Sequence, residues 1–213
     1  MRMSMEIPLW NRLRTMEPSL LVLLVIVVGA VGVIGLVIAI TAPVGILVGD
    51  TQWKLISAFH GMSATVFLIG ATIAVYLAWR LYIGEIKAFT DLKWLSAFST
   101  AMSVVTISFG NWIYVAYRAA PPAGVNPCTG YPRSCFLATL PQVHQVFFEF
   151  KEFIALFTLP MFLVATFILW KYGDSLIPNR EARAAASVPV LLGWFFLLVA
   201  YVLGAAITKL AGV

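Results

Sequence analysis

The chain has 213 residues, of which 62% are hydrophobic and 11% are charged, and its mean hydropathy is +0.96. Soluble domains are about 45–50% apolar and about 25% charged, so the composition excludes an ordinary soluble domain. It also excludes a disordered or disulfide-rich chain, and the few charges behind the net +5 cannot form a nucleic-acid-binding face. The composition therefore predicts a multi-pass membrane protein.

Five hydrophobic segments are long enough to cross a bilayer, whose apolar core of about 30 Å needs a helix of roughly 20 residues. Because a helix satisfies its own backbone in lipid, we predict an all-α, five-helix transmembrane bundle. The spans are expected at about 19–42, 53–82, 93–118, 141–171 and 188–211. Together they form a single domain over residues 18–213.

Residues 1–17 are predicted to form a separate segment on the membrane surface. Its apolar residues share one helical face, and its arginines lie elsewhere on the wheel. This pattern is typical of a short interfacial helix. The apolar face consists of Leu9, Trp10, Leu13 and Met16.

The distribution of Lys and Arg predicts the orientation of the bundle. If the N-terminus is cytoplasmic, nine of the 14 Lys and Arg residues lie on the cytoplasmic side and five on the outer side. The positive-inside rule then favours a cytoplasmic N-terminus and an outer C-terminus. We expect this protein to be integral to the plasma membrane.

The longest connection, residues 119–140, is predicted to lie outside and holds both cysteines, Cys128 and Cys135. Proline and glycine residues around the pair let the chain double back. An oxidising compartment and this spacing predict a disulfide. A thiolate metal site is the alternative, and the absence of a nearby histidine disfavours it.

Three prolines indicate where helices begin or bend. Pro141 and Pro189 are expected in the first turns of the fourth and fifth spans, where a missing N–H is tolerated. Pro160 lies inside the fourth span and predicts a kink. In the third span, polar and small residues recur every three or four positions and predict a helix-packing face. These are Ser103, Thr106, Gly110, Tyr114 and Tyr117.

The chain has two histidines, His60 in the second span and His144 in the fourth, both expected in the outer half of the membrane. Two imidazoles that face each other from different helices can ligate a b-type haem iron. Small residues beside His60 would leave room for the macrocycle, and Lys151 could contact a propionate. The sequence therefore predicts one cytochrome b-like haem near the outer face, with both histidines as metal ligands.

Further polar residues gather near the outer ends of the third and fourth spans. Ionisable groups at membrane depth are costly, and by default they mark a site. We expect Tyr114, Arg118 and Lys151 to contact the cofactor or a quinone beside it. The candidate proton-handling residues are Asn111, Glu149 and Glu152.

These patterns favour an electron-transfer subunit, rather than a self-contained enzyme, that passes electrons between the quinone pool and an outer acceptor. The layout is similar to that of small five-helix membrane subunits that anchor respiratory enzymes. Two alternatives remain: a non-catalytic membrane anchor or accessory subunit, and a metal-binding or proton-relay protein that uses Glu149 and Glu152. The expected partners are the lipid bilayer and other membrane or peripheral subunits or a second copy of the chain, without nucleic acid.

Overall fold

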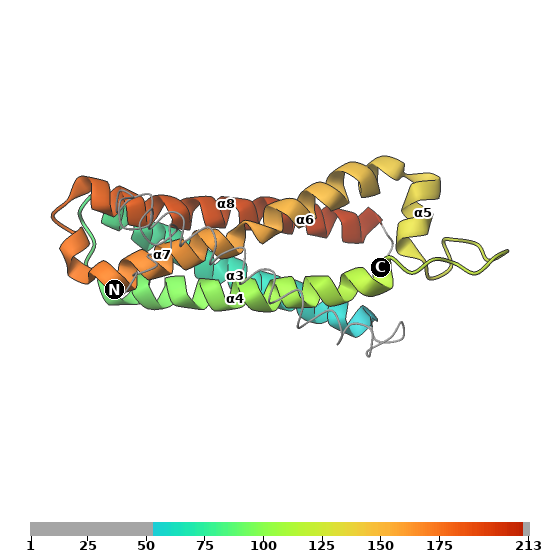
Figure 1. The fold of residues 1–213 in the computed structure, drawn as a ribbon, viewed down its shortest axis with the longest axis horizontal. Coiled ribbons are helices and arrows are strands. Elements are labelled where there is room, and N and C mark those ends of the chain that lie inside the picture. Colours follow the sequence, from blue (N-terminus) through green and yellow to red (C-terminus); the bar gives the residue numbers. More distant parts are fainter. Residues whose placement is uncertain (1–52, 211–213) are drawn as a thin grey trace, which may run out of the picture.

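The structure, a computed structural model, describes residues 53–210 (Figure 1). Four of its helical segments are long and apolar enough to cross a membrane: Leu55–Tyr82, Phe89–Val115, Val143–Leu176 and Arg180–Leu210. The prediction of a helical, multi-pass membrane protein is confirmed at this level. The predicted first span, 19–42, and the interfacial segment, 1–17, lie outside the described residues, so the five-helix count and the orientation stay predictions.

The spanning helices form a ring in which each contacts two neighbours. Helices α3 and α7 lie on opposite sides of the ring, and each packs against both α4 and α8. The described elements are α3 (Trp53–Tyr82), α4 (Phe89–Tyr117), α5 (Pro132–Thr139), the π-helix η2 (Val143–Phe148), α6 (Glu149–Leu156), α7 (Thr158–Tyr172), the 3-10 turn η3 (Gly173–Leu176) and α8 (Arg180–Leu210).

One end of the ring is covered by the long connection between α4 and η2. Cys128 and Cys135 form a disulfide there, as predicted, and the short helix α5 crosses the end of the bundle (Figure 1). We call the half of the bundle nearest this connection the disulfide half. The other half, which ends at the short connections 83–88 and 173–179, we call the packed half.

The packed half has a continuous apolar core. Alanines on α3 let the neighbouring helices approach closely, which matters in lipid because association there depends on close packing rather than on escape from water. The largest side chains in this core are almost fully buried: Phe67, Leu81, Leu92, Phe162, Leu169 and Val190.

Hydroxyl groups join α4 to α7 within the packed half. Ser103 Oγ lies 2.7 Å from Thr158 Oγ1, and Thr166 Oγ1 lies 3.0 Å from Ser96 Oγ and 2.9 Å from Thr100 Oγ1. Such pairs satisfy polar groups that would otherwise meet apolar surroundings. Of the predicted packing face of the third span, Ser103 makes such a contact, whereas Thr106, Gly110, Tyr114 and Tyr117 line a cavity.

Pro160 interrupts the fourth span as predicted. Proline has no N–H to donate to the residue four positions earlier, and α6 ends at that residue, Leu156. Thr158 Oγ1 donates to the Ala155 carbonyl at 2.7 Å, and the regular bonding resumes with Met161 N–H donating to Phe157 O at 3.3 Å. The break separates α6, in the disulfide half, from α7.

The last helix begins earlier than predicted. The side-chain oxygen of Asn179 accepts hydrogen bonds from the N–H groups of Glu181 and Ala182, at 2.9 and 3.2 Å. This cap starts α8 at Arg180, because it satisfies free N–H groups of the first turn. The prediction that Pro189 lies in the first turn is wrong, since this proline lies inside the helix.

Candidate functional site

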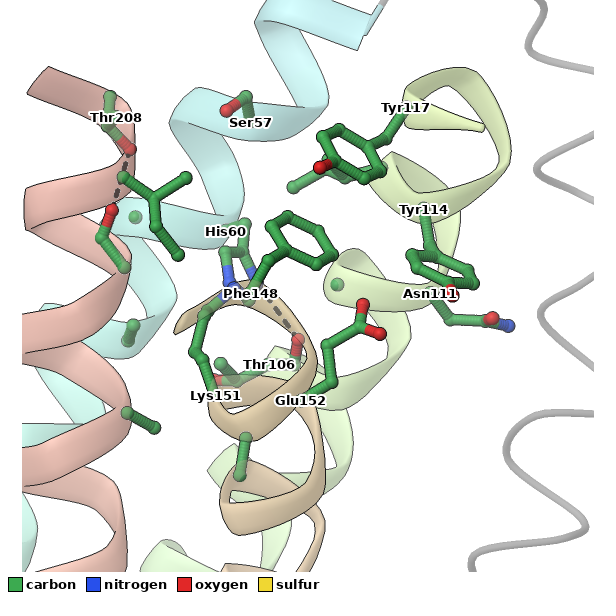
Figure 2. Close-up of a pocket in the computed structure, with 18 of the residues that line it drawn as sticks. Ser57, His60, Thr106, Asn111, Tyr114, Tyr117, Phe148, Lys151, Glu152 and Thr208 are labelled. Atoms are coloured by element: carbon green, nitrogen blue, oxygen red, sulfur yellow. Dashed lines mark hydrogen bonds between the residues drawn. The ribbon is translucent and has the colours of Figure 1, made fainter. Parts of the chain in front are cut away.

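The disulfide half encloses a cavity of about 1160 Å³. Its walls come from α3, α4, α6 and α8, and the connection after α4 contributes residues at one end. Most of the lining is apolar, and its polar groups come from all four helices (Figure 2). The polar and aromatic lining residues labelled there are Ser57, His60, Thr106, Asn111, Tyr114, Tyr117, Phe148, Lys151, Glu152 and Thr208.

The cavity exists because α6 departs from the packing of α7. Whereas α7 packs against both α4 and α8, α6 packs against α8 and makes no extended contact with α4. The two helices instead face each other across the cavity, with Tyr114 on α4 and Glu152 on α6 both lining it. The proline break thus divides a closed packing interface from an open one.

His60 presents one ring nitrogen to the cavity. Its Nδ1 lies 3.0 Å from the carbonyl oxygen of Thr106, and a carbonyl can only accept, so Nδ1 carries the hydrogen. The ring packs on Gly110, where an added Cβ would lie 3.3 Å from His60 Cε1. In this neutral tautomer Nε2 keeps its lone pair, and it is available to a proton donor or a metal.

Lys151 and Glu152 extend into the same cavity from consecutive positions on α6 (Figure 2). Lys151 Nζ lies 5.3 Å from the centroid of the Phe148 ring, and its Cε is accommodated by Gly204 on α8, where a Cβ would be 3.4 Å away. Within residues 53–210, no carboxylate oxygen lies within 4.0 Å of Nζ. Lys151 interacts electrostatically at longer range with His60 and Glu152, and Glu152 with Tyr114.

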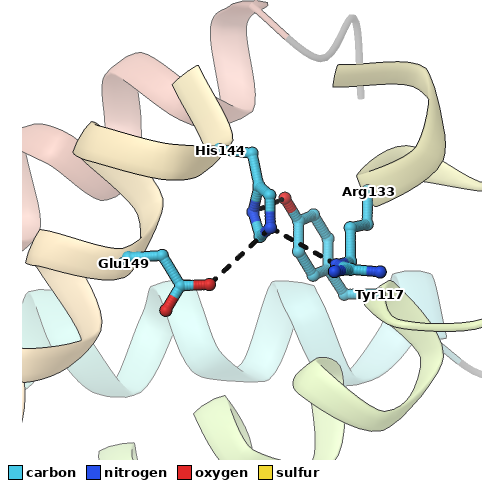
Figure 3. Close-up of polar contacts among 4 residues, drawn as sticks. All are labelled: Tyr117, Arg133, His144 and Glu149. Carbon is cyan, nitrogen blue, oxygen red and sulfur yellow. Dashed lines mark hydrogen bonds and ion pairs between the residues drawn. The ribbon is translucent and has the colours of Figure 1, made fainter. Parts of the chain in front are cut away.

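His144 belongs to a different cluster, with Tyr117, Arg133 and Glu149 (Figure 3). Its Nδ1 lies 3.0 Å from the Tyr117 hydroxyl, and its Nε2 accepts a hydrogen bond from Arg133 Nε at 3.3 Å. The Glu149 carboxylate is 3.6 Å from the same Nε2. Since Nε2 accepts from Arg133, Nδ1 carries the hydrogen and donates to Tyr117.

Tyr117 connects this cluster to the cavity. It lines the cavity, is 6% exposed, and stacks on Phe148 with ring centroids 4.1 Å apart. Burial, and then the Glu152 carboxylate, raise the pKa of the Tyr117 phenol, while Arg133 lowers it. The pKa stays above the ordinary value of about 10, so the phenol is protonated at neutral pH and can both donate and accept.

The predicted site residues therefore fall into two groups. Lys151, Glu152, Tyr114, Asn111 and His60 meet at the cavity. Glu149 lies beside His144 instead, and the guanidinium of Arg118 lies 4.5 Å over the Tyr114 ring.

Only one of the two histidines fits the predicted haem. His60 lines the cavity, and within residues 53–210 its Nε2 has no hydrogen-bond partner, as an axial ligand requires. His144 does not line the cavity, and both of its ring nitrogens are engaged by Tyr117 and Arg133. Elsewhere in residues 53–210, no group of three or more His, Cys, Asp or Glu side chains is placed to hold a metal ion.

Sequence reasoning missed two contributors to the site. In the sequence, Arg133 was considered only as one of the five positive charges expected on the outer side. It lies between Cys128 and Cys135, in the segment that the disulfide restrains. Tyr117 counted only as the end of a packing stripe. The π-helix turn Val143–Phe148, which carries His144, has no clear sequence signal; such turns are often found at functional sites.

Comparison with known proteins identifies no family for this chain. No protein-family model, no curated protein and no solved structure matches it.

Proposed function

We propose that the chain is a membrane-embedded electron-transfer subunit whose cavity binds the head group of a membrane-soluble quinone. The observation that carries this proposal is the convergence of His60, Lys151 and Glu152 in a largely apolar cavity within the spanning helices. Buried polar groups are costly in such a place unless a ligand or partner uses them.

The chemistry of these groups matches a quinone head group. Lys151 Nζ can donate to a quinone carbonyl oxygen, and His60 Nε2 can accept from the hydroxyl of a quinol. Glu152 can exchange a proton with the ligand through its carboxylate. Reduction of a quinone consumes two electrons and two protons, and the electrons would be exchanged with a redox centre of a partner protein at the outer face.

The arrangement of the helices favours a ligand that comes from the lipid. Within residues 53–210, α6 makes no extended contact with α4, and the cavity lies between these two helices, so a flat ring that enters from the membrane would pass between them. Small residues on α3 and α8 leave space for the ring. Gly61 on α3 lines the cavity, and no heavy atom of residues 53–210 lies within 4 Å of the position of an added Cβ there.

Titration of a short-chain quinone into the protein in lipid nanodiscs tests the proposal. We expect His60→Ala, Lys151→Met and Glu152→Gln each to weaken binding by about ten-fold, the loss of roughly one good hydrogen bond. Ser99→Ala is a matched control, because Ser99 Oγ is buried in the packed half and has no hydrogen-bond partner within residues 53–210. Absent binding, or equal affinity in all four variants, would overturn the proposal.

Haem binding stays a prediction. If a haem is bound, the free Nε2 supports His60 as an iron ligand, and the partners of His144 disfavour a His60–His144 pair. A reduced-minus-oxidised absorption spectrum tests this. We expect any haem band to be lost in His60→Ala and kept in His144→Ala; the reverse pattern would contradict the assignment.

A further inference from the structure

We infer that the predicted first span of this chain, residues 19–42, packs into a groove between α3 and α8 in the disulfide half, antiparallel to α3. This segment lies outside the described residues, and the groove is the surface that receives it. The inference goes beyond the proposed function and does not depend on which ligand the cavity binds.

Helices α3 and α8 are joined by side-chain contacts that recur every seven residues. Trp194 Nε1 donates to Thr72 Oγ1 at 3.0 Å, and two turns nearer the disulfide end Thr65 Oγ1 lies 3.1 Å from the Tyr201 hydroxyl. Residues seven apart share a helix face, so these contacts define one antiparallel register between the two helices.

The next pair in this register, Ala58 and Thr208, borders an opening of the cavity. Both residues are exposed, and both line the cavity. Gly61 lies between this face of α3 and His60 on the helical wheel. No heavy atom of a neighbouring helix in residues 53–210 lies within 4 Å of a Cβ added at Gly61.

The border of this opening consists of small residues, and we call it the α3–α8 groove. Its members are exposed and also line the cavity: Ala58 and Thr65 on α3, and Ala205 and Thr208 on α8. Within lipid, helices associate where small residues let their backbones approach closely. The groove is therefore suited to a further helix that also carries small residues.

The segment 19–42 offers small residues in the matching pattern. Gly32 and Ala39 are seven residues apart and share one face of the predicted helix. Thr65 and Ala58 are also seven residues apart on α3. In an antiparallel pair, Ala39 can face Ala58 while Gly32 faces Thr65.

The length of the chain before α3 supports the same placement. Residues 43–52 join the predicted span to Trp53, the first residue of α3, and short connections usually join antiparallel neighbours. Ala39 lies three residues before the end of the predicted span and Ala58 five residues after the start of α3. At 1.5 Å per residue, the two differ in depth by only about 3 Å.

The outer face of α3 suits lipid better than another helix, because its side chains are large. They are 49–64% exposed: Leu55, Met62, Val66 and Ile69. A helix in the α3–α8 groove instead completes the cavity wall on that side. The side between α4 and α6 then remains the route by which a quinone enters from the membrane.

Cysteine cross-linking of the full chain in nanodiscs tests the inference. Ala39→Cys is combined with Ala58→Cys in one variant and with Thr208→Cys in another, and mass spectrometry identifies the linked peptides after mild oxidation. A disulfide needs Cα atoms within about 7 Å, so we expect both pairs to cross-link within one chain, about ten-fold or more faster than a control pair. The native disulfide, found in the same digest, shows that each variant has folded.

The control pair is Ala39→Cys with Phe59→Cys. Phe59 is adjacent to Ala58, but its ring stacks with Phe109 of α4 and so points away from the groove. A control as fast as the test pairs, or a link to Ala58→Cys without one to Thr208→Cys, would overturn the inference. Links between two chains would assign the groove to a second copy, and no link in either test pair would assign it to lipid; both results would also overturn it. No quinone is present, so failure of this placement and failure of quinone binding are distinguishable.

Discussion

The packed half and the disulfide half are built from the same ring of helices, but their interiors differ. In the packed half, Phe162 and Leu169 are fully buried against neighbouring helices. In the disulfide half, the continuation of the same span lines a cavity of about 1160 Å³. The change occurs at Pro160, so one missing backbone donor separates a close-packed interface from a chamber that can hold a ligand.

The polar groups of the two halves differ in the same way. Hydroxyls of the packed half pair with one another across helices, as Thr100 does with Thr166. In the disulfide half, Lys151 and His60 Nε2 face the cavity instead. Polar groups that already have partners stabilise the helix contact, whereas those aimed at a cavity are available to a ligand.

The largest expected effect comes from removing the disulfide. Cys128→Ser combined with Cys135→Ser should cost about 2–3 kcal/mol, by the loop entropy of a bridge between residues seven apart. We expect this loss of stability to be confined to the disulfide half, so hydrogen exchange should rise in α5 and η2 and stay unchanged in α7. Faster exchange spread evenly over both halves would contradict this.

Adding a methyl group to a glycine should distinguish the halves next. Gly193→Ala places a Cβ 2.9 Å from Phe162 Cε2 in the packed half, which should cost about 2 kcal/mol of stability. In Gly61→Ala, beside the cavity, the new Cβ meets no heavy atom of the described part of the chain within 4 Å, so this substitution should be neutral or slightly stabilising. Unfolding measurements in bicelles test this; equal losses would show that the disulfide half is as tightly packed.

Restoring the missing backbone donor should make the halves more alike. In Pro160→Ala, the new N–H can bond to the Leu156 carbonyl, so α6 and α7 should join into one helix and the cavity should shrink. Quinone affinity should fall several-fold, on the order of 1 kcal/mol. Titration in nanodiscs measures the quinone affinity. An unchanged affinity would show that the helix break at Pro160 does not determine the cavity.

The stability of the disulfide half should depend on alkaline pH. The raised pKa of Tyr117 means that the folded protein holds this proton more tightly than the unfolded chain does. Stability is therefore retained below the ordinary pKa of about 10 and declines as the pH rises beyond it. Tyr117→Phe should flatten this decline, whereas Tyr76→Phe, at an exposed position, should not.

The smallest effect is a spectroscopic signature rather than a change in stability. Both histidines should be neutral and carry hydrogen on Nδ1, because His60 donates to a carbonyl and His144 Nε2 accepts from Arg133. The nitrogen-15 chemical shifts of the two rings report the tautomers directly. A hydrogen on Nε2 of His60 would contradict the geometry of the cavity wall.

Much of the fold was predictable because membrane helices follow local rules. Hydrophobic length predicted the second to fifth spans, and Pro160 predicted the break. The start of α8 was not predicted, since the cap by Asn179 acts before the apolar run begins, where hydropathy is uninformative. The disulfide followed from the spacing of two cysteines in a turn-rich connection.

The site was predictable in its residue types but not in its grouping. Sequence placed His60, His144 and Lys151 in the outer half, yet which of them share a cavity depends on helix rotation and on the π-helix turn before α6. One extra residue per turn changes the direction of every side chain on that segment. This rotation places His144 beside Tyr117 and leaves Lys151 in the cavity.

The most direct test of the central claim is photolabelling with a quinone that carries a photoreactive group, followed by residue-level mass spectrometry. We expect labels on cavity residues such as Tyr114 and Lys151, and excess unlabelled quinone should suppress them. Any label at Phe153, whose side chain is 65% exposed on α6, should not be suppressed by the competitor. Labels spread evenly over the outer surface, unaffected by competitor, would contradict the claim that this cavity binds a quinone.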